Sequence, residues 1–163
     1  MLDRTRVAIQ SYILAEKFNI TNEVVHNIIN SYIDYCRKSI IRGVRIDFLG
    51  LVSIIPDVIN DDFKFTMAYM CNEVANSLSL SYNIVFSVMS EYINTAKSQL
   101  KDGTTVEIRG LVTMTPLSEN GCVTKVHSNI SQSLRKMLAN SDSNVKSFRV
   151  HTYKSLRDEF LNS

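Results

Sequence analysis

The sequence predicts an α+β fold built from two tandem units, each made of two helices and a β-hairpin, with an extra strand and helix segment at the C-terminal end. Three observations carry this prediction. The chain repeats itself at a distance of 60 residues, the hydrophobic period changes from that of a helix to that of a strand within each repeat, and 45% of the 163 residues are hydrophobic. Because that apolar content is enough for a shared core, we expect units over 1–65 and 66–126 to pack on each other, followed by a basic closing segment over 127–163.

The repeat aligns residues 7–56 with residues 67–116 without a gap. Most aligned residues match in character, and the identical ones include a tyrosine, two glycines and a proline in each copy. These pairs are Tyr32 and Tyr92, Gly43 and Gly103, Gly50 and Gly110, and Pro56 and Pro116. Chance does not keep glycine, proline and the apolar pattern in phase over such a length, so we interpret the repeat as a duplication.

Each unit begins with two predicted helices. Apolar residues within 7–18 recur at steps of three and four, which is typical of a short amphipathic helix. Thr21 is placed to cap a second helix, whose apolar stripe covers 24–40 and stops before a glycine. The second unit repeats this arrangement, with Ser81 as the cap and a stripe over 84–100.

The hydrophobic period then becomes that of a strand. Residues 44–48 and 104–108 alternate between apolar and polar side chains, and a glycine after each marks a bulge or a sharp bend. We expect the chain to return as a hairpin in both units. The returning segments are 51–64 in the first unit and 111–126 in the second, where 118–121 has the composition of a hairpin turn.

The C-terminal region is predicted to hold a helix over 130–138, a loop over 141–144, a strand over 145–150 and a terminal helix over 152–161. Residues 122–163 carry seven basic and three acidic side chains, although the net charge of the whole chain is only +2. If the fold gathers the basic side chains, they would meet phosphate or an acidic protein face; the alternative is an ordinary solvated helix surface. The candidates are Lys125, Arg135, Lys136, Lys146, Arg149, Lys154 and Arg157.

Motifs for catalysis are missing from the sequence. It has no glycine-rich phosphate loop, no HExxH motif, no paired-carboxylate motif and no nucleophile elbow. The histidines and cysteines have no ligand spacing and no CxxC pairing; they are His26, His127, His151, Cys36, Cys71 and Cys122. We therefore expect no enzymatic activity, no catalytic or metal-binding residues, no cofactor and no small-molecule substrate.

Membrane and secretion signals are missing as well. No apolar run approaches the roughly 18 residues needed to span a bilayer. The N-terminal residues are not followed by the apolar stretch of a signal peptide. We expect a protein that has no membrane partner and is not secreted.

The glycine pattern of both units resembles that of the HU and integration host factor (IHF) family. Proteins of that family have two helices, the pattern G-x-x-V-x-L-x-G-F-G-x-F at the entry to a β-sheet, a long β-ribbon arm and a C-terminal helix. The matching positions are Gly43, Ile46, Phe48, Gly50, Leu51 and Ile54 in the first unit and Gly103, Val106, Ile108, Gly110, Leu111 and Met114 in the second. The stretch 154–160 is similar to the family's closing K-x-L-K-D-x-V. Because the family forms intertwined dimers, the resemblance implies a single-chain pseudodimer of two HU/IHF-like units.

The chain departs from the family in the part that grips DNA. Val52 and Val112 replace the last glycine of the motif, the one that follows the phenylalanine. The arm is nearly missing, since only residues 57–64 are left for it in the first unit and a four-residue turn in the second. The family's arm-tip proline, which wedges between base steps, has no counterpart. No DNA-contacting arm residue of the family can therefore be assigned here.

Shortened arms that expose apolar side chains would mark a protein interface. The candidates are Ile54, Ile55, Val58 and Ile59, and the alternative is that they complete the core.

The resemblance leaves two functions open. Tailed bacteriophages, including the crAss-like group, use IHF-like proteins as ring components of the neck and tail, so one expectation is a structural protein that acts through protein contacts. Its partners would be other subunits in a homo-oligomeric ring or a larger assembly, in the virion or the host cytoplasm. The alternative is a sequence-nonspecific, DNA-binding architectural protein, which the basic C-terminal region favours.

Overall fold

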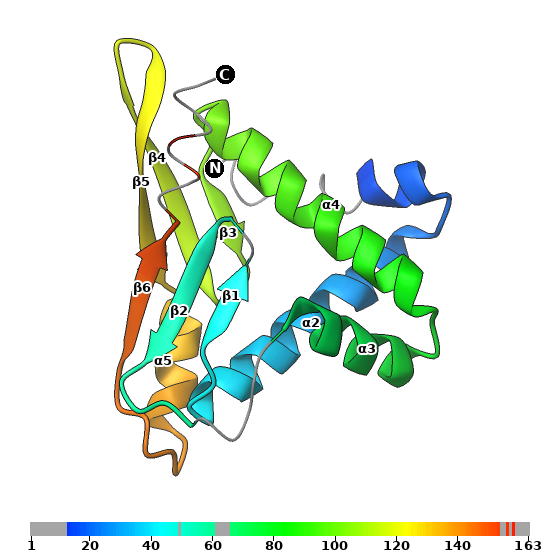
Figure 1. The fold of residues 1–163 in the computed structure, drawn as a ribbon, viewed down its shortest axis with the longest axis horizontal. Coiled ribbons are helices and arrows are strands. Elements are labelled where there is room, and N and C mark those ends of the chain that lie inside the picture. Colours follow the sequence, from blue (N-terminus) through cyan, green and yellow to red (C-terminus); the bar gives the residue numbers. More distant parts are fainter. Residues whose placement is uncertain (1–12, 49, 61–65, 154–155, 157, 159–163) are drawn as a thin grey trace.

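The computed structural model describes residues 13–48, 50–60, 66–153, 156 and 158 (Figure 1). A helix over residues 13–18 comes first. The elements that follow are α2 (Asn22–Ile41), β1 (Ile46–Phe48), β2 (Val52–Pro56), α3 (Met67–Leu78), α4 (Tyr82–Lys101), β3 (Val106–Ile108), β4 (Val112–Glu119), β5 (Cys122–Ile130), α5 (Gln132–Ala139) and β6 (Phe148–Thr152). The strands lie on one side of the molecule and α2, α3 and α4 on the other (Figure 1). The predicted α+β class is confirmed.

The two copies of the repeat fold alike. Helices α2 and α4 each have 20 residues and begin 60 positions apart. Their predicted caps are both formed, because the hydroxyls of Thr21 and Ser81 accept a hydrogen bond from the amide three residues on, at 3.2 and 3.3 Å. Strand β1 faces β2 in the register in which β3 faces β4, again shifted by 60 residues.

The buried face of each long helix is the one that the apolar pattern predicts. In α2 it holds Val25, Ile28, Ile29, Tyr32, Ile33, Cys36 and Ile40, and in α4 Val85, Val88, Met89, Tyr92, Ile93, Ala96 and Leu100. Both faces belong to one continuous core.

Each unit has a three-stranded antiparallel sheet, but the third strands have different origins. In the second unit, β5 follows β4 through the predicted hairpin turn, in which Asn120 and Gly121 have positive φ of 54° and 81°. In the first unit, β6 from the far end of the chain pairs with β2, which gives the order β1-β2-β6.

The hairpin expected in the first unit is formed, because β2 returns antiparallel to β1 within 51–64, but among the described residues no further strand follows β2 before α3. The chain leaves β2 at Pro56 and turns back onto the end of α2, where the amide of Asn60 donates to the carbonyl of Gly43 at 2.8 Å. The edge of β2 is then occupied by β6, so no local returning strand pairs there.

Strand β6 occupies in the first sheet the position that β5 occupies in the second. Thr152 pairs with Val52 as Ile130 pairs with Val112. Both strands are followed by a Ser-Leu-Arg sequence, at 133–135 and 155–157, whose leucines are fully buried. The C-terminal part of the chain thus completes the first sheet. Along the sequence, the elements of the second unit come between β2 and β6, although these two strands are neighbours in the sheet.

Smaller boundaries also differ from the expectations. The helix expected over 130–138 is α5, and Ile130 is the last residue of β5. The strand expected over 145–150 begins and ends two to three residues later, as β6. Within the expected terminal helix, Thr152 belongs to β6, Leu156 and Asp158 are helical, and the remaining positions after Tyr153 lie outside the described residues, as do residues 7–12 of the first helix.

Polar contacts at equivalent positions interlock the two units. The guanidinium of Arg37 in α2 donates to the carbonyl of Gly110 in the second unit at 2.6 Å and to the hydroxyl of Ser133 in α5 at 2.8 Å. At the matching position of α4, the Lys97 ammonium lies 2.5 Å from the place that a Cβ on Gly50 would occupy. Each long helix therefore reaches the glycine bend of the opposite unit.

Candidate functional site

The loop between α5 and β6 brings together the residues that the sequence analysis had considered separately. It is fixed to the first unit by three hydrogen bonds. The hydroxyl of Ser143 donates to the carbonyl of Ile41, the amide of Lys146 donates to a carboxylate oxygen of Asp57 at 3.0 Å, and the amide of Asp57 donates to the carbonyl of Ser147 at 3.0 Å. The end of α2, the end of β2 and this loop are thus held side by side.

Three adjoining hollows surround the loop. The largest, of about 830 Å³, lies between the end of α2, residues 58–60 and residues 141–145. A second, of about 290 Å³, lies between α5 and residues 145–148, and a third, of about 360 Å³, lies between the end of β2 and residues 147–149. Because neighbouring hollows share lining residues, we treat them as one surface feature and call it the basic groove.

The apolar part of the basic groove includes two predicted interface residues. Val58 is 48% exposed and Ile59 is 52% exposed, and both line the largest hollow. Ile55 is half-buried and lines the third hollow. Ile54 does not belong to this surface: it is fully buried in the core, since alternate residues of a strand point to opposite faces.

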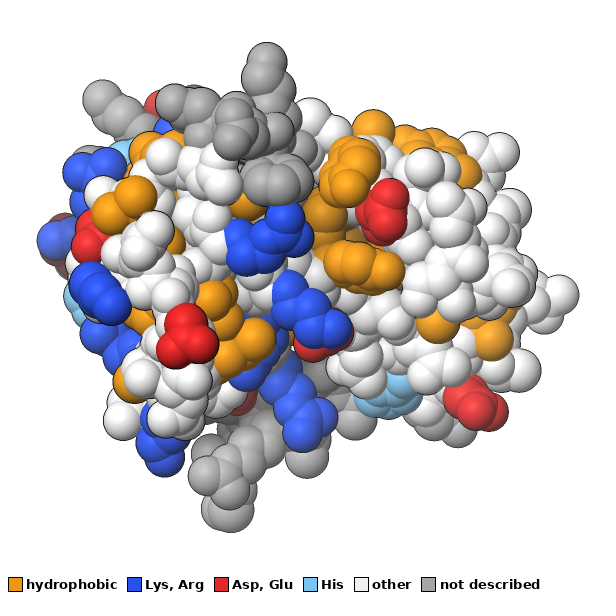
Figure 2. Space-filling view, turned by 90° about the horizontal axis from the view of Figure 1, so that it is seen from below, with side chains coloured by type: hydrophobic (Ala, Val, Ile, Leu, Met, Phe, Trp, Pro, Cys, Tyr) orange, Lys and Arg blue, Asp and Glu red, His pale blue; other side chains and the backbone are white. Residues whose placement is uncertain are grey.

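The rim of the groove is mostly cationic. Arg42, Arg135, Lys146 and Arg149 line its three parts and are exposed, and Lys136 is exposed on the same short helix as Arg135. Seen from below, Lys and Arg side chains gather over the half of the molecule that carries the sheets and α5, with hydrophobic side chains between them (Figure 2). This half of the surface therefore combines positive charge with exposed apolar area.

Two carboxylates line the groove as well. Backbone hydrogen bonds, above all the one from the Lys146 amide, lower the pKa of Asp57 below its usual value. The Asp57 carboxylate thus holds the loop in place. The second carboxylate that lines the groove is that of Asp142. Among the described residues that line the groove, four cations stand against two carboxylates, a balance that favours a partner of negative charge.

The other predicted basic residues lie elsewhere. Lys125 pairs with Leu117 towards the tip of the β4–β5 hairpin, at the end of the sheets opposite α5 (Figure 1). Lys154 and Arg157 lie outside the described residues. Arg42 was missed by the sequence analysis because it lies at the end of α2, far along the chain from the C-terminal basic residues, and it joins them only through tertiary packing.

Gly43 shapes the groove, and the repeat singled it out as the glycine that follows the apolar stripe of the second helix. Gly43 has φ of +89°, and a Cβ there would lie 2.9 Å from the carbonyl oxygen of Val58 and 3.1 Å from the amide nitrogen of Asn60. A side chain at this position would push residues 58–60 away from the end of α2. The equivalent Gly103 has a similar φ but no neighbouring atom within 4 Å, so the close approach belongs to the first unit.

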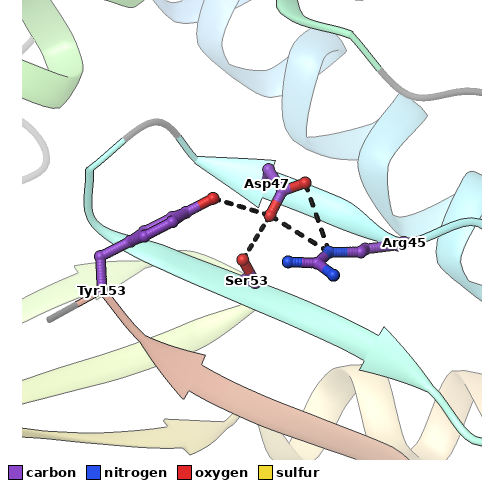
Figure 3. Close-up of polar contacts among 4 residues, drawn as sticks. All are labelled: Arg45, Asp47, Ser53 and Tyr153. Atoms are coloured by element: carbon purple, nitrogen blue, oxygen red, sulfur yellow. Dashed lines mark hydrogen bonds and ion pairs between the residues drawn. The ribbon is translucent and has the colours of Figure 1, made fainter.

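A polar cluster around Asp47 fastens the C-terminal segment to the first sheet (Figure 3). The Asp47 carboxylate accepts hydrogen bonds from the hydroxyl of Ser53, from the hydroxyl of Tyr153 at 2.9 Å and from Arg45 Nε at 3.4 Å. Ser53 is fully buried and donates to the carboxylate, so its hydroxyl is not presented as a nucleophile. The cluster acts as a structural fastening at the point where β6 ends.

The cysteines and histidines form no further site in the described part of the chain. No three side chains of His, Cys, Asp or Glu gather there in a group that would hold a metal ion. Burial raises the pKa of Cys36, and it raises that of Cys71 to about 11, so both thiols are protonated near neutral pH. Among the described helices, none combines the length and the apolar character needed to cross a bilayer.

No family model, curated protein or solved structure matches this chain in the comparisons made.

Proposed function

We propose that this chain is a non-enzymatic assembly protein with an HU/IHF-like fold, acting through protein–protein contacts at the basic groove, as a ring component of the neck or tail of a phage virion. The order helix, helix, three strands, helix in the second unit supports the HU/IHF-like assignment. The matching position of β6 in the first sheet supports a pseudodimer of two such units.

The assembly role is supported mainly by the course of the chain after β2, where the first arm of an HU/IHF-like protein would lie. Residues 57–60 turn back onto the end of α2 and leave Val58 and Ile59 exposed at the groove. The second hairpin ends in a tight turn after an eight-residue strand. A pair of long arms that embraces a duplex is therefore not formed by the described residues, and the exposed apolar side chains are typical of a protein contact.

DNA binding is the second candidate, because the cationic rim of the groove favours it. Arg135, Lys146 and Arg149 line adjoining hollows, Lys136 lies on the same helix as Arg135, and these cations could neutralise phosphates. Such binding would be independent of sequence, since phosphate contacts carry no base information.

Binding to a duplex of about 40 base pairs across a salt series, with light scattering on the same sample, separates the two functions. The assembly role predicts no binding near about 100 mM salt and a mass above that of one 18.5 kDa chain. Submicromolar, strongly salt-dependent binding by a monomer would overturn it in favour of the DNA-binding role.

A further inference from the structure

The end of the molecule formed by the helix hairpins is opposite in charge to the basic groove. Its described residues, 13–27 and 66–91, hold four carboxylates and one lysine, and that lysine, Lys17, is paired with Glu91 at 2.9 Å. All other described residues together hold twelve basic and eight acidic side chains. Figure 2 shows the same separation, with no Lys or Arg on the helical half in that view. We call residues 13–27 and 66–91 the acidic helical end.

The acidic helical end also exposes aromatic side chains that the fold does not require. Tyr82 and Phe86 are 37% and 39% exposed, and their rings stack at 5.8 Å between centroids. The equivalent positions in the first unit hold Asn22 and His26, so the same helix start forms without aromatic residues. Exposed, stacked aromatic rings at the same end of the molecule as these carboxylates are typical of a protein-binding surface.

The two surfaces lie at opposite ends of one helix. The first turn of α2 belongs to the acidic helical end, and its last residue, Ile41, lines the basic groove. A helix of 20 residues is about 30 Å long, so the two surfaces of one chain cannot meet each other.

We propose that the basic groove of one copy binds the acidic helical end of a second copy, in a head-to-tail contact. This inference rests on the assembly role proposed above and specifies its contact. Charge complementarity sets the orientation, and the exposed apolar side chains at Val58, Ile59, Tyr82 and Phe86 supply area to bury. Because the two surfaces differ, the contact is heterologous, and repeating it gives a ring if the rotation closes or a filament if it does not.

The test reverses the charge of each surface separately. Glu16→Lys with Glu73→Lys alters the acidic helical end, and Arg135→Glu with Arg149→Glu alters the basic groove. Lys101→Glu with Lys125→Glu is the control: it changes the net charge by as much as the groove variant, at exposed positions outside both surfaces. Circular dichroism establishes that each variant is folded, and sedimentation velocity measures association from about 50 to about 500 mM salt.

We expect the wild type and the control to associate and to dissociate as salt is added, and each surface variant to associate at least about tenfold more weakly. An equimolar mixture of the two surface variants should regain association, because each reversed surface then meets a complementary one. A wild type that stays monomeric at about 100 µM would overturn the contact, as would a mixture that fails to associate.

The outcomes also separate this contact from the proposed function. If the wild type associates and neither surface variant weakens it, the head-to-tail contact is wrong while the assembly role stands. If the wild type is monomeric and binds the DNA duplex, and the groove variant loses that binding, both proposals are wrong.

Discussion

Replacing Gly43 by alanine, with Gly103→Ala as the matched control, tests the packing of residues 58–60 against the end of α2. Both glycines end the long helix of their unit with nearly the same backbone, at φ of +89° and +86°. An alanine at such an angle costs about 1–2 kcal/mol at either site. The loss of freedom in the unfolded chain is also the same for the two substitutions, so it cancels in the comparison.

The two sites differ in what the new methyl group would meet. At Gly43 it would lie 2.9 Å from a backbone carbonyl oxygen of residue 58, and at Gly103 nothing lies within 4 Å. Forcing a methyl group against packed backbone costs about 1–3 kcal/mol more. We therefore expect Gly43→Ala to lower the free energy of unfolding by about 2–5 kcal/mol and Gly103→Ala by about 1–2 kcal/mol.

Urea unfolding followed by far-UV circular dichroism measures both losses, and the slope of the transition verifies that both variants remain two-state. Because residues 58–60 line the basic groove, Gly43→Ala should also weaken self-association while Gly103→Ala leaves it unchanged. Equal destabilisation by the two substitutions would refute the packing of residues 58–60 against the end of α2.

Three further predictions concern single groups. Tyr92→Phe should leave the free energy of unfolding unchanged or raise it by up to about 1–3 kcal/mol, because the buried Tyr92 hydroxyl has no hydrogen-bond partner among the described residues. A lower free energy of unfolding in urea would show that the hydroxyl has a partner. Arg37→Met should lower the free energy of unfolding by about 1.5–3 kcal/mol, because it removes the bonds to Gly110 and Ser133, and an unchanged urea midpoint would contradict the interlock. The pKa of Asp57 is lowered in the folded state. Its contact with the Lys146 amide should therefore persist at pH values above the ordinary aspartate pKa of about 3.9 and be lost as the pH falls through the lowered pKa. An NMR titration of the Lys146 amide shift with a midpoint at or above about 3.9 would contradict this.

The position of β6 explains why the chain can hold two similar units and still be one body. The second unit lies between β2 and β6 in the sequence, so the strand that completes the first sheet follows all strands of the second sheet along the chain. Two hydrogen bonds hold the end of β6 in place: the Tyr153 hydroxyl donates to the Asp47 carboxylate, and the Tyr153 amide donates to the Leu51 carbonyl at 3.0 Å. Unfolding of the C-terminal segment is therefore expected to open the first sheet.

Local features of the molecule were determined by the sequence itself. The helix caps, the apolar stripes of α2 and α4, the change of period at Gly43 and Gly103, and the turn at Asn120 all depend on residues within a few positions of one another. Because the sequence repeats, the same helices and strands were predicted in both units. These parts could be predicted because each is stabilised by its own neighbours in the chain.

The candidate site was predictable only in pieces. Val58, Ile59, Arg135, Lys146 and Arg149 were each identified, but as two unrelated sets, one apolar and one basic. Their common location depends on the loop between α5 and β6, which lies against the end of α2 through hydrogen bonds across the chain. Ile54 lies in β2 and is fully buried, whereas Val58 and Ile59 follow the strand and are exposed; where the strand would end was not visible before the sheet was formed.

The sequence alone determined the repeat, the type and order of most elements and the apolar faces that build the core, because these follow from local periodicity. Only the tertiary structure decided that β6 completes the first sheet and that the segment after β2 folds back to form one side of a basic groove. A five-residue strand carries too little information to specify a partner far away in the chain. That choice depends on which pairing buries the most apolar surface and leaves the fewest backbone groups unpaired, and both are properties of the whole fold.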